Sequence, residues 1–155
     1  MMLADTKKRE LKRQLLAHCL RLQEENADNL RAMILDVTES VDNQGQPVDG
    51  FDAYRSVQMD RRDLFAQQLD KAIMDMQVLQ RMDGSLLCRE VRFGAVVRTR
   101  EQNIFVAIGL GRVNLDGDCY FVISTQVPFY HAMAGKREGD AFEFRGREHT
   151  ILEVF

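Results

Sequence analysis

The sequence lacks the features that mark membrane and secreted proteins. Its longest apolar run, IFVAIGL at residues 104–110, is much shorter than the roughly 20 residues that a membrane-spanning helix needs. The opening stretch MMLADTKKRELKRQ is positively charged, but no apolar core segment follows it, so it does not read as a secretory signal. We therefore expect a cytoplasmic protein with no membrane role.

Cysteine and histidine are few and scattered. Cys19, Cys88 and Cys119 are odd in number and form no CxxC pair, which argues against a disulfide framework and against a structural zinc site. We interpret all three as small apolar side chains. The three histidines also lack metal-ligand spacing, so we expect no metal site built wholly from this chain.

Motifs of self-contained enzymes are missing as well. The sequence has no nucleophile elbow, phosphate-binding loop or His-rich metal motif. GLGRVNLDG, at residues 109–117, contains only a GxG that no predicted helix follows, and is interpreted as a bulge and turn. We expect the chain not to be an enzyme by itself.

Charge is distributed unevenly along the chain, although the net charge is only −3. Residues 1–21 carry six basic and two acidic side chains, whereas residues 22–54 carry one basic and eight acidic, a balance of −7. The second segment would repel a nucleic-acid backbone, so direct nucleic-acid binding there is not expected. The alternative is an ordinary solvated helix surface.

Two long helices are predicted in the first half. Neither glycine nor proline occurs in residues 2–44, and residues 51–82 lack both as well. Each segment has a narrow apolar stripe that a partner helix must cover, so we expect an antiparallel hairpin over residues 1–83. The expected stripes are Leu11, Leu15, Cys19, Leu22, Asn26, Leu30, Met33 and Val37 in the first helix, and Tyr54, Val57, Leu64, Phe65, Leu69, Ala72, Ile73, Met76 and Leu79 in the second.

The second half, residues 84–155, has short β-type runs separated by glycine-containing turns. One stretch, residues 128–140, begins with proline and has glycine at its last position but one, which predicts a short helix. The whole chain is therefore predicted to be α+β, with a helical hairpin followed by a small antiparallel-sheet domain. The expected core is Val91, Val96, Ile104, Val106, Ile108, Phe121, Ile123, Phe142, Phe144 and Ile151.

Carboxylates gather in and around the linker between the predicted helices. Asp49 and Asp52 are three residues apart, and Asp36, Glu39 and Asp42 repeat that spacing at the end of the first helix. One interpretation is helix capping, which stabilises a helix by about 0.5–2 kcal/mol. The other is that Asp49 and Asp52 supply hard oxygen ligands next to a Mg²⁺ ion held by another protein.

The second half resembles the bacterial Gre factors, the GreA/GreB family of transcription elongation factors. The resemblance is carried, in order, by VRFGAVV at 91–97, FVAIGLGRV at 105–113, ISTQVPFYHAMAGKREGD at 123–140 and the closing ILEV. It implies an FKBP-like fold for residues 84–155 and a coiled coil for residues 1–83. It also implies that the coiled coil enters the secondary channel of bacterial RNA polymerase.

The resemblance implies a role for the linker aspartates. In the family an acidic pair at i and i+3 lies beside the polymerase's catalytic Mg²⁺ and stimulates cleavage of backtracked transcripts, and Asp49 and Asp52 keep that spacing. No cofactor is expected on the chain alone, which we expect to be a monomer. Here Asp replaces the usual Glu, and Tyr54 follows sooner than in the family. A Gre-type regulator without cleavage activity and a coiled-coil adaptor therefore stay open as alternatives.

Overall fold

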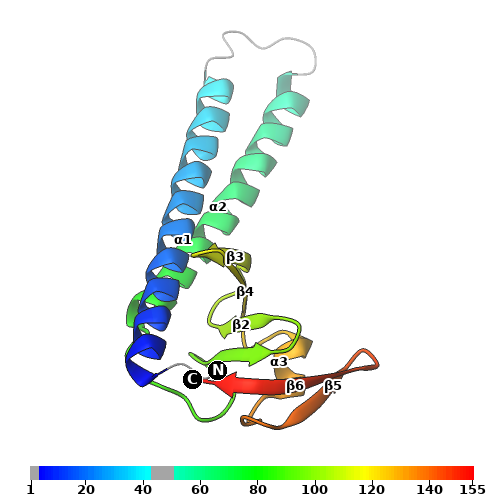
Figure 1. Ribbon diagram of the computed structural model, residues 1–155. Helices are drawn as coiled ribbons and strands as arrows, with labels where there is room; N and C mark the ends of the chain where they lie inside the picture. Colours follow the sequence, from blue (N-terminus) through cyan, green and yellow to red (C-terminus); the bar gives the residue numbers. More distant parts are fainter. Residues whose placement is uncertain (1–3, 43–50) are drawn as a thin grey trace. The chain divides into compact units, whose positions relative to one another are not determined.

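The computed structural model describes residues 4–42 and 51–155, which form three α-helices and six β-strands (Figure 1). They divide into two compact units. We call Arg21–Gln77 the helical unit, and Met1–Leu20 together with Val78–Phe155 the sheet unit. The sheet unit takes residues from both ends of the predicted hairpin. The predicted limits 1–83 and 84–155 stay a prediction about which parts fold independently.

The two predicted helices are present. Helix α1 spans Asp5–Asp42 and α2 spans Phe51–Arg81, as the absence of glycine and proline indicated. Within the helical unit they pack through a small core of Ala27, Leu30 and Ala72. Neither helix, over its described residues, is long and apolar enough to cross a membrane.

The buried rows of the helices differ from the predicted stripes. In α1, Gln23 and Ala27 are buried, while Asn26 is exposed. The side-chain amide of Gln23 donates a hydrogen bond to Asp75 Oδ2 at 3.1 Å, which explains how a polar residue occupies the interface. Three predicted interface residues are substantially exposed: Met33 at 45%, Val57 at 56% and Leu64 at 51%.

The sheet has six strands in the spatial order β3-β4-β2-β1-β6-β5. It is mixed rather than purely antiparallel, which corrects the prediction, because β2 and β4 pair in parallel. The parallel pair arises because β4, and not β3, lies beside β2, with β3 outside it at the edge. The strands are β1 (Val96–Thr99), β2 (Asn103–Val106), β3 (Gly111–Leu115), β4 (Asp118–Ile123), β5 (Ala141–Phe144) and β6 (Arg147–Val154).

One face of the sheet carries most of the predicted core. Helix α3, Pro128–Met133, begins with proline as expected and packs near β5. The Phe129 ring makes T-shaped contacts with Phe142 and Phe144, with centroid separations of 5.6 and 5.1 Å. This core contains Val91, Ala95, Val97, Ile104, Val106, Met133, Phe142, Ile151 and Val154.

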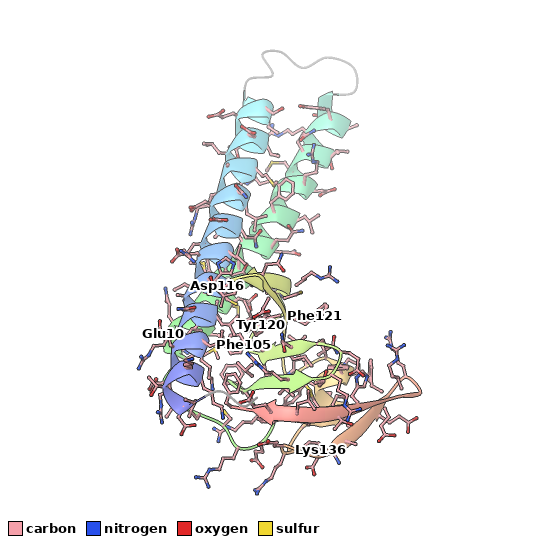
Figure 2. All side chains as sticks on the ribbon, in the orientation of Figure 1. Glu10, Phe105, Asp116, Tyr120, Phe121 and Lys136 are labelled. Atoms are coloured by element: carbon pink, nitrogen blue, oxygen red, sulfur yellow. The ribbon has the colours of Figure 1, made fainter. Side chains whose placement is uncertain are left out.

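The opposite face of the sheet is also buried, and the predicted core included Val96 of this face, which pairs with Phe105. Phe105 and Tyr120, labelled in Figure 2, are almost fully buried. Val122 is paired with Phe105 across the parallel strands and is buried with them. Phe121 pairs with Ile104 and so lies on the first face, where it is half-buried with the guanidinium of Arg112 5.4 Å from the centre of its ring. A run such as IFVA is typical of strands buried on both faces.

Candidate functional site

Of the two predicted site aspartates, the structure describes Asp52 but not Asp49. Asp49 lies outside the described residues, so its predicted role as a metal ligand stays a prediction. Asp52 lies in the first turn of α2 and is exposed. A carboxylate at this position interacts favourably with the helix dipole, so capping and metal binding both remain compatible with it.

The end of α1 contributes further exposed carboxylates. Asp36 and Glu39 lie one helical turn apart and both are exposed. The side chain of Asp42, the last residue of α1, falls outside the described part. Across residues 4–42 and 51–155 no three His, Cys, Asp or Glu side chains are grouped in a way that could hold a metal ion.

A hydrogen bond joins the helices close to these carboxylates. The hydroxyls of Ser40 in α1 and Tyr54 in α2 lie 2.7 Å apart. Val37 and Val41 are buried beside this end of the helical unit. Helix residues that are two positions apart in the sequence are separated by about 200° around the helix axis. Tyr54 and Asp52 therefore point in nearly opposite directions. Tyr54 thus ties α2 to α1 while Asp52 is presented to solvent.

The basic residues at the start of α1 make contacts within the sheet unit that were not predicted from the sequence. Lys8, Arg9 and Lys12 all bind residues near the sheet. Arg9 Nε donates to the carbonyl of Ser85 at 3.0 Å. The sequence contains a signal for this, since Lys12 lies three residues before Leu15 and Lys8 four residues before Lys12, on the same helix face.

Lys8 belongs to a buried ionic cluster. Its ammonium lies 3.4 Å from Glu153 Oε1, and Nε of Arg98 lies 3.9 Å from Oε2 of the same carboxylate. Both cations also approach the ring of Phe155, Lys8 at 5.6 Å and Arg98 at 5.8 Å from its centroid. Glu153 is buried, and these cations help to offset the cost of burying its carboxylate. The cluster holds the first turns of α1 to the last strand.

Lys12 is the most deeply buried of these cations, at 3% exposure. Its Nζ donates to the carbonyl of Leu86 at 2.6 Å and lies 3.8 Å from Cys88 Sγ. Burial lowers the pKa of Lys12 from its usual value, while the neighbouring Cys88 acts in the opposite direction. Lys12 and Cys88 both line a cavity of about 340 Å³ within the sheet unit.

Comparisons with known proteins give a limited answer. No family model matches the chain, and no curated protein matches it. Among solved structures, that of the transcription factor Gfh1 is similar with a TM-score of 0.35 and 15% identity, over 87% of this chain and 92% of that one. A structure of GreA factor homolog 1 (Gfh1) of Thermus thermophilus gives 0.34 and 17%, over 90% and 92%. Likenesses this weak assign neither a partner nor an activity.

Proposed function

We propose that the chain is a transcription factor of Gre type that binds bacterial RNA polymerase through its secondary channel. Its two long helices deliver the linker carboxylates to the polymerase active site, where Asp49 and Asp52 assist hydrolysis of a backtracked transcript. The chain acts as a cytoplasmic monomer and is not an enzyme by itself. Nucleic acid is met only through the transcription complex.

The observation that carries this proposal is the placement of Asp52. It is exposed in the first turn of a 31-residue helix, on the side away from the tyrosine that ties α2 to α1. A carboxylate held this way is free to meet an ion outside the chain. The order of the motifs between residues 91 and 154 supports the same assignment, since it resembles the Gre family.

The polymerase supplies the catalytic Mg²⁺ in this mechanism. Asp49 and Asp52 add hard oxygen ligands, which recruit a second Mg²⁺ or orient the attacking water. Two carboxylates on the chain alone would bind Mg²⁺ weakly, because Mg²⁺ requires near-octahedral coordination and keeps several waters. The activity therefore depends on a complex with the polymerase.

The test begins with binding and ends with cleavage. We expect the chain to be retained by purified bacterial core polymerase at modest salt and to stimulate RNA 3′-end cleavage in a stalled, backtracked complex. The Asp49→Asn, Asp52→Asn double variant should bind with near-normal affinity and lose most of the stimulation. Asn caps a helix about as well as Asp, so the helices should stay intact.

The matched control is an Asp60→Asn, Asp63→Asn double variant. Both residues are exposed on α2 and have the same spacing, but they lie two to three turns beyond Asp52. Stimulation should survive in this control. A chain that does not bind polymerase would refute the proposal. Loss of stimulation in Asp36→Asn, Glu39→Gln variants, with Asp49 and Asp52 dispensable, would keep the mechanism and refute the choice of residues.

A Gre-type regulator without cleavage activity is the second candidate. The observation in its favour is the position of Tyr54, which follows Asp52 by two residues, sooner than in the Gre family. Its hydroxyl is hydrogen-bonded to that of Ser40. A chain that binds polymerase yet never stimulates cleavage would select this candidate. The adaptor hypothesis predicts no polymerase binding at all, so the same first experiment separates it from both.

A further inference from the structure

Large apolar side chains are exposed in the segment between α2 and β1. Leu86 is 63% exposed and Phe93 is 43% exposed, and Met82 and Leu87 are half-buried. All four line the cavity of about 340 Å³ within the sheet unit, which we call the Phe93 cavity. Single apolar residues are common on protein surfaces, but a group that lines one open cavity marks a site of contact with another molecule.

The Phe93 cavity also carries an excess of positive charge. Its charged lining residues are the cations Lys12, Arg81 and Arg92 and the carboxylate Asp83. Arg81 and Arg92 are exposed, and within the described residues neither forms an ion pair. Lys12 is buried, and its ammonium donates to the carbonyl of Leu86 rather than to a carboxylate. The cavity therefore attracts negatively charged groups.

The carboxylate of the cavity has other partners. Asp83 Oδ1 accepts hydrogen bonds from the backbone N–H of Ser85 at 2.9 Å and from the hydroxyl of Ser85 at 2.6 Å. These bonds stabilise the ionised form and lower the pKa of Asp83. Asp83 forms no ion pair with any cation that the structure describes. A carboxylate supplied by a ligand would give the cations the close partner that Asp83 does not provide.

We propose that the Phe93 cavity is a docking site for an acidic segment of another protein, in which Leu, Phe or Met lies within one helical turn of Asp or Glu. The apolar side chain of this segment enters the cavity beside Leu86 and Phe93. Its carboxylates meet the exposed guanidinium groups of Arg81 and Arg92. Arginine clusters recognise acidic motifs in other proteins, and arginine and aromatic residues are enriched at protein interfaces.

The shape and chemistry of the cavity favour a protein segment over other polyanions. Its volume of about 340 Å³ lies in the range of ligand pockets, roughly 300–1,000 Å³. A bilayer surface does not enter a concave site, because membrane-binding apolar side chains project into the lipid. A sugar–phosphate backbone would neutralise the arginines and leave Leu86 and Phe93 uncovered. A peptide with both kinds of side chain satisfies the apolar and the charged residues together.

The proposed docking site is distinct from the linker carboxylates. The Phe93 cavity is lined by residues of the sheet unit, whereas Asp52 belongs to the helical unit. The inference therefore does not depend on polymerase binding.

The experiment selects ligands for the native full-length chain from a random peptide library displayed on phage. The enriched peptides should combine Asp or Glu with Leu, Phe or Met within one helical turn. The most enriched peptide is then synthesised with a fluorescent label, and its dissociation constant is measured by fluorescence anisotropy. Replacing its Asp and Glu by Asn and Gln should weaken binding at least about tenfold at low salt.

The apolar part of the site is tested with two leucine variants. Leu86→Ala should weaken peptide binding about tenfold, because the leucine side chain is covered only in the complex. The backbone carbonyl that binds Lys12 remains in this variant. Leu152→Ala is the matched control, since Leu152 is also exposed, lies in β6 of the same unit and lines neither cavity. Binding should be unchanged in Leu152→Ala.

The charged part is tested with two arginine variants. Arg92→Gln should weaken peptide binding about three- to fivefold at low salt, as expected for an exposed ion pair. Added salt should remove the difference between this variant and the parent chain. Arg89→Gln is the matched control, because Arg89 is exposed and lines only the other cavity, of about 490 Å³. Its binding should equal that of the parent chain.

Several results would overturn the proposal. One is an enriched set of peptides without acidic residues, or a library that yields no peptide whose binding depends on Leu86. Another is equal weakening in Leu86→Ala and Leu152→Ala, or in Arg92→Gln and Arg89→Gln. Self-association of the chain in analytical ultracentrifugation that is lost in Leu86→Ala would identify a second copy as the occupant instead. Binding of anionic lipid vesicles or of an oligonucleotide that is lost in Leu86→Ala would likewise replace the protein segment.

Discussion

In the sheet unit both faces of the central strands are buried, whereas in the helical unit each helix buries a single narrow row. The sheet unit encloses large side chains such as Phe105, Tyr120 and Phe155 almost completely. The core of the helical unit is Ala27, Leu30 and Ala72, with three larger side chains partly covered around it. A long helical pair with so narrow an interface leaves most of its surface available for contact with another molecule.

The two units also differ in the kind of polar side chain that they bury. The sheet unit buries charged residues, including Lys12 and Glu153, and Glu153 lies beside the cations Lys8 and Arg98. In the helical unit the buried polar residue is the neutral Gln23, bound to Asp75. Buried charges are costly unless they are paired, so the sheet unit should respond much more strongly to loss of a polar partner.

The largest expected effect is in the second face of the sheet. Phe105→Ala should lower the free energy of unfolding of the sheet unit by about 3–5 kcal/mol, because it empties a fully enclosed site. Phe121→Ala should cost only about 1–2 kcal/mol, since that ring is half-exposed beneath Arg112. Urea denaturation followed by circular dichroism measures both. Equal losses would mean that the site of Phe105 is no more enclosed than the site of Phe121 in β4.

A smaller effect is expected in the helical unit. Leu30→Ala should reduce the free energy of unfolding of that unit by about 2–3 kcal/mol, near the lower end for a buried leucine, because the core around it is small. Leu35→Ala is the control, since Leu35 lies on the same helix and is 57% exposed. Its change should stay within about 0.5 kcal/mol. A loss at Leu35 as large as at Leu30 would contradict the observed interface.

The ionic cluster of the sheet unit gives the next effect. Glu153→Gln removes the negative charge that faces Lys8 and Arg98, and should cost about 1–3 kcal/mol. Glu143→Gln is the matched control, because Glu143 is exposed on β5 and faces Glu148 across the strand pair. It should be neutral within about 0.5 kcal/mol. A neutral Glu153→Gln would show that the cluster contributes little to holding α1.

The smallest effect is a pH dependence from Cys19. The folded thiol has a raised pKa of about 11, compared with 9.0 when exposed, so the unfolded chain loses this proton first. Stability is therefore complete below pH 9 and falls as pH rises toward 11, by about 1 kcal/mol at pH 10. Cys19→Ala should remove this decrease, and Cys119→Ala should keep it. Denaturation curves between pH 7 and pH 10 provide the measurement.

Much of the fold could be predicted from the sequence, because the signals are local. The lack of glycine and proline in two long segments predicted α1 and α2, and proline followed by glycine predicted α3. The β-type runs of the second half are strands in the structure. Strand pairing joins distant residues, so the parallel pairing of β2 with β4 was not predicted.

The candidate site was predictable only in part. Asp52 is exposed at the start of α2, where the sequence placed it, and the role of Asp49 and Asp52 stays a prediction. The contact of Lys12 with Cys88 joins residues 76 positions apart and has no signature in either neighbourhood.

Local composition by itself determined which segments are helical and where the negative charge accumulates, because propensity and charge belong to individual residues and their near neighbours. Only the tertiary structure decided that Lys12 is buried, that Lys8 meets Glu153, and that the second face of the sheet is enclosed. Burial depends on what another segment places against a surface. From the sequence alone, a lysine on an apolar helix face is expected to be solvated. Only the fold shows that a carbonyl, a thiol or a carboxylate lies beside it.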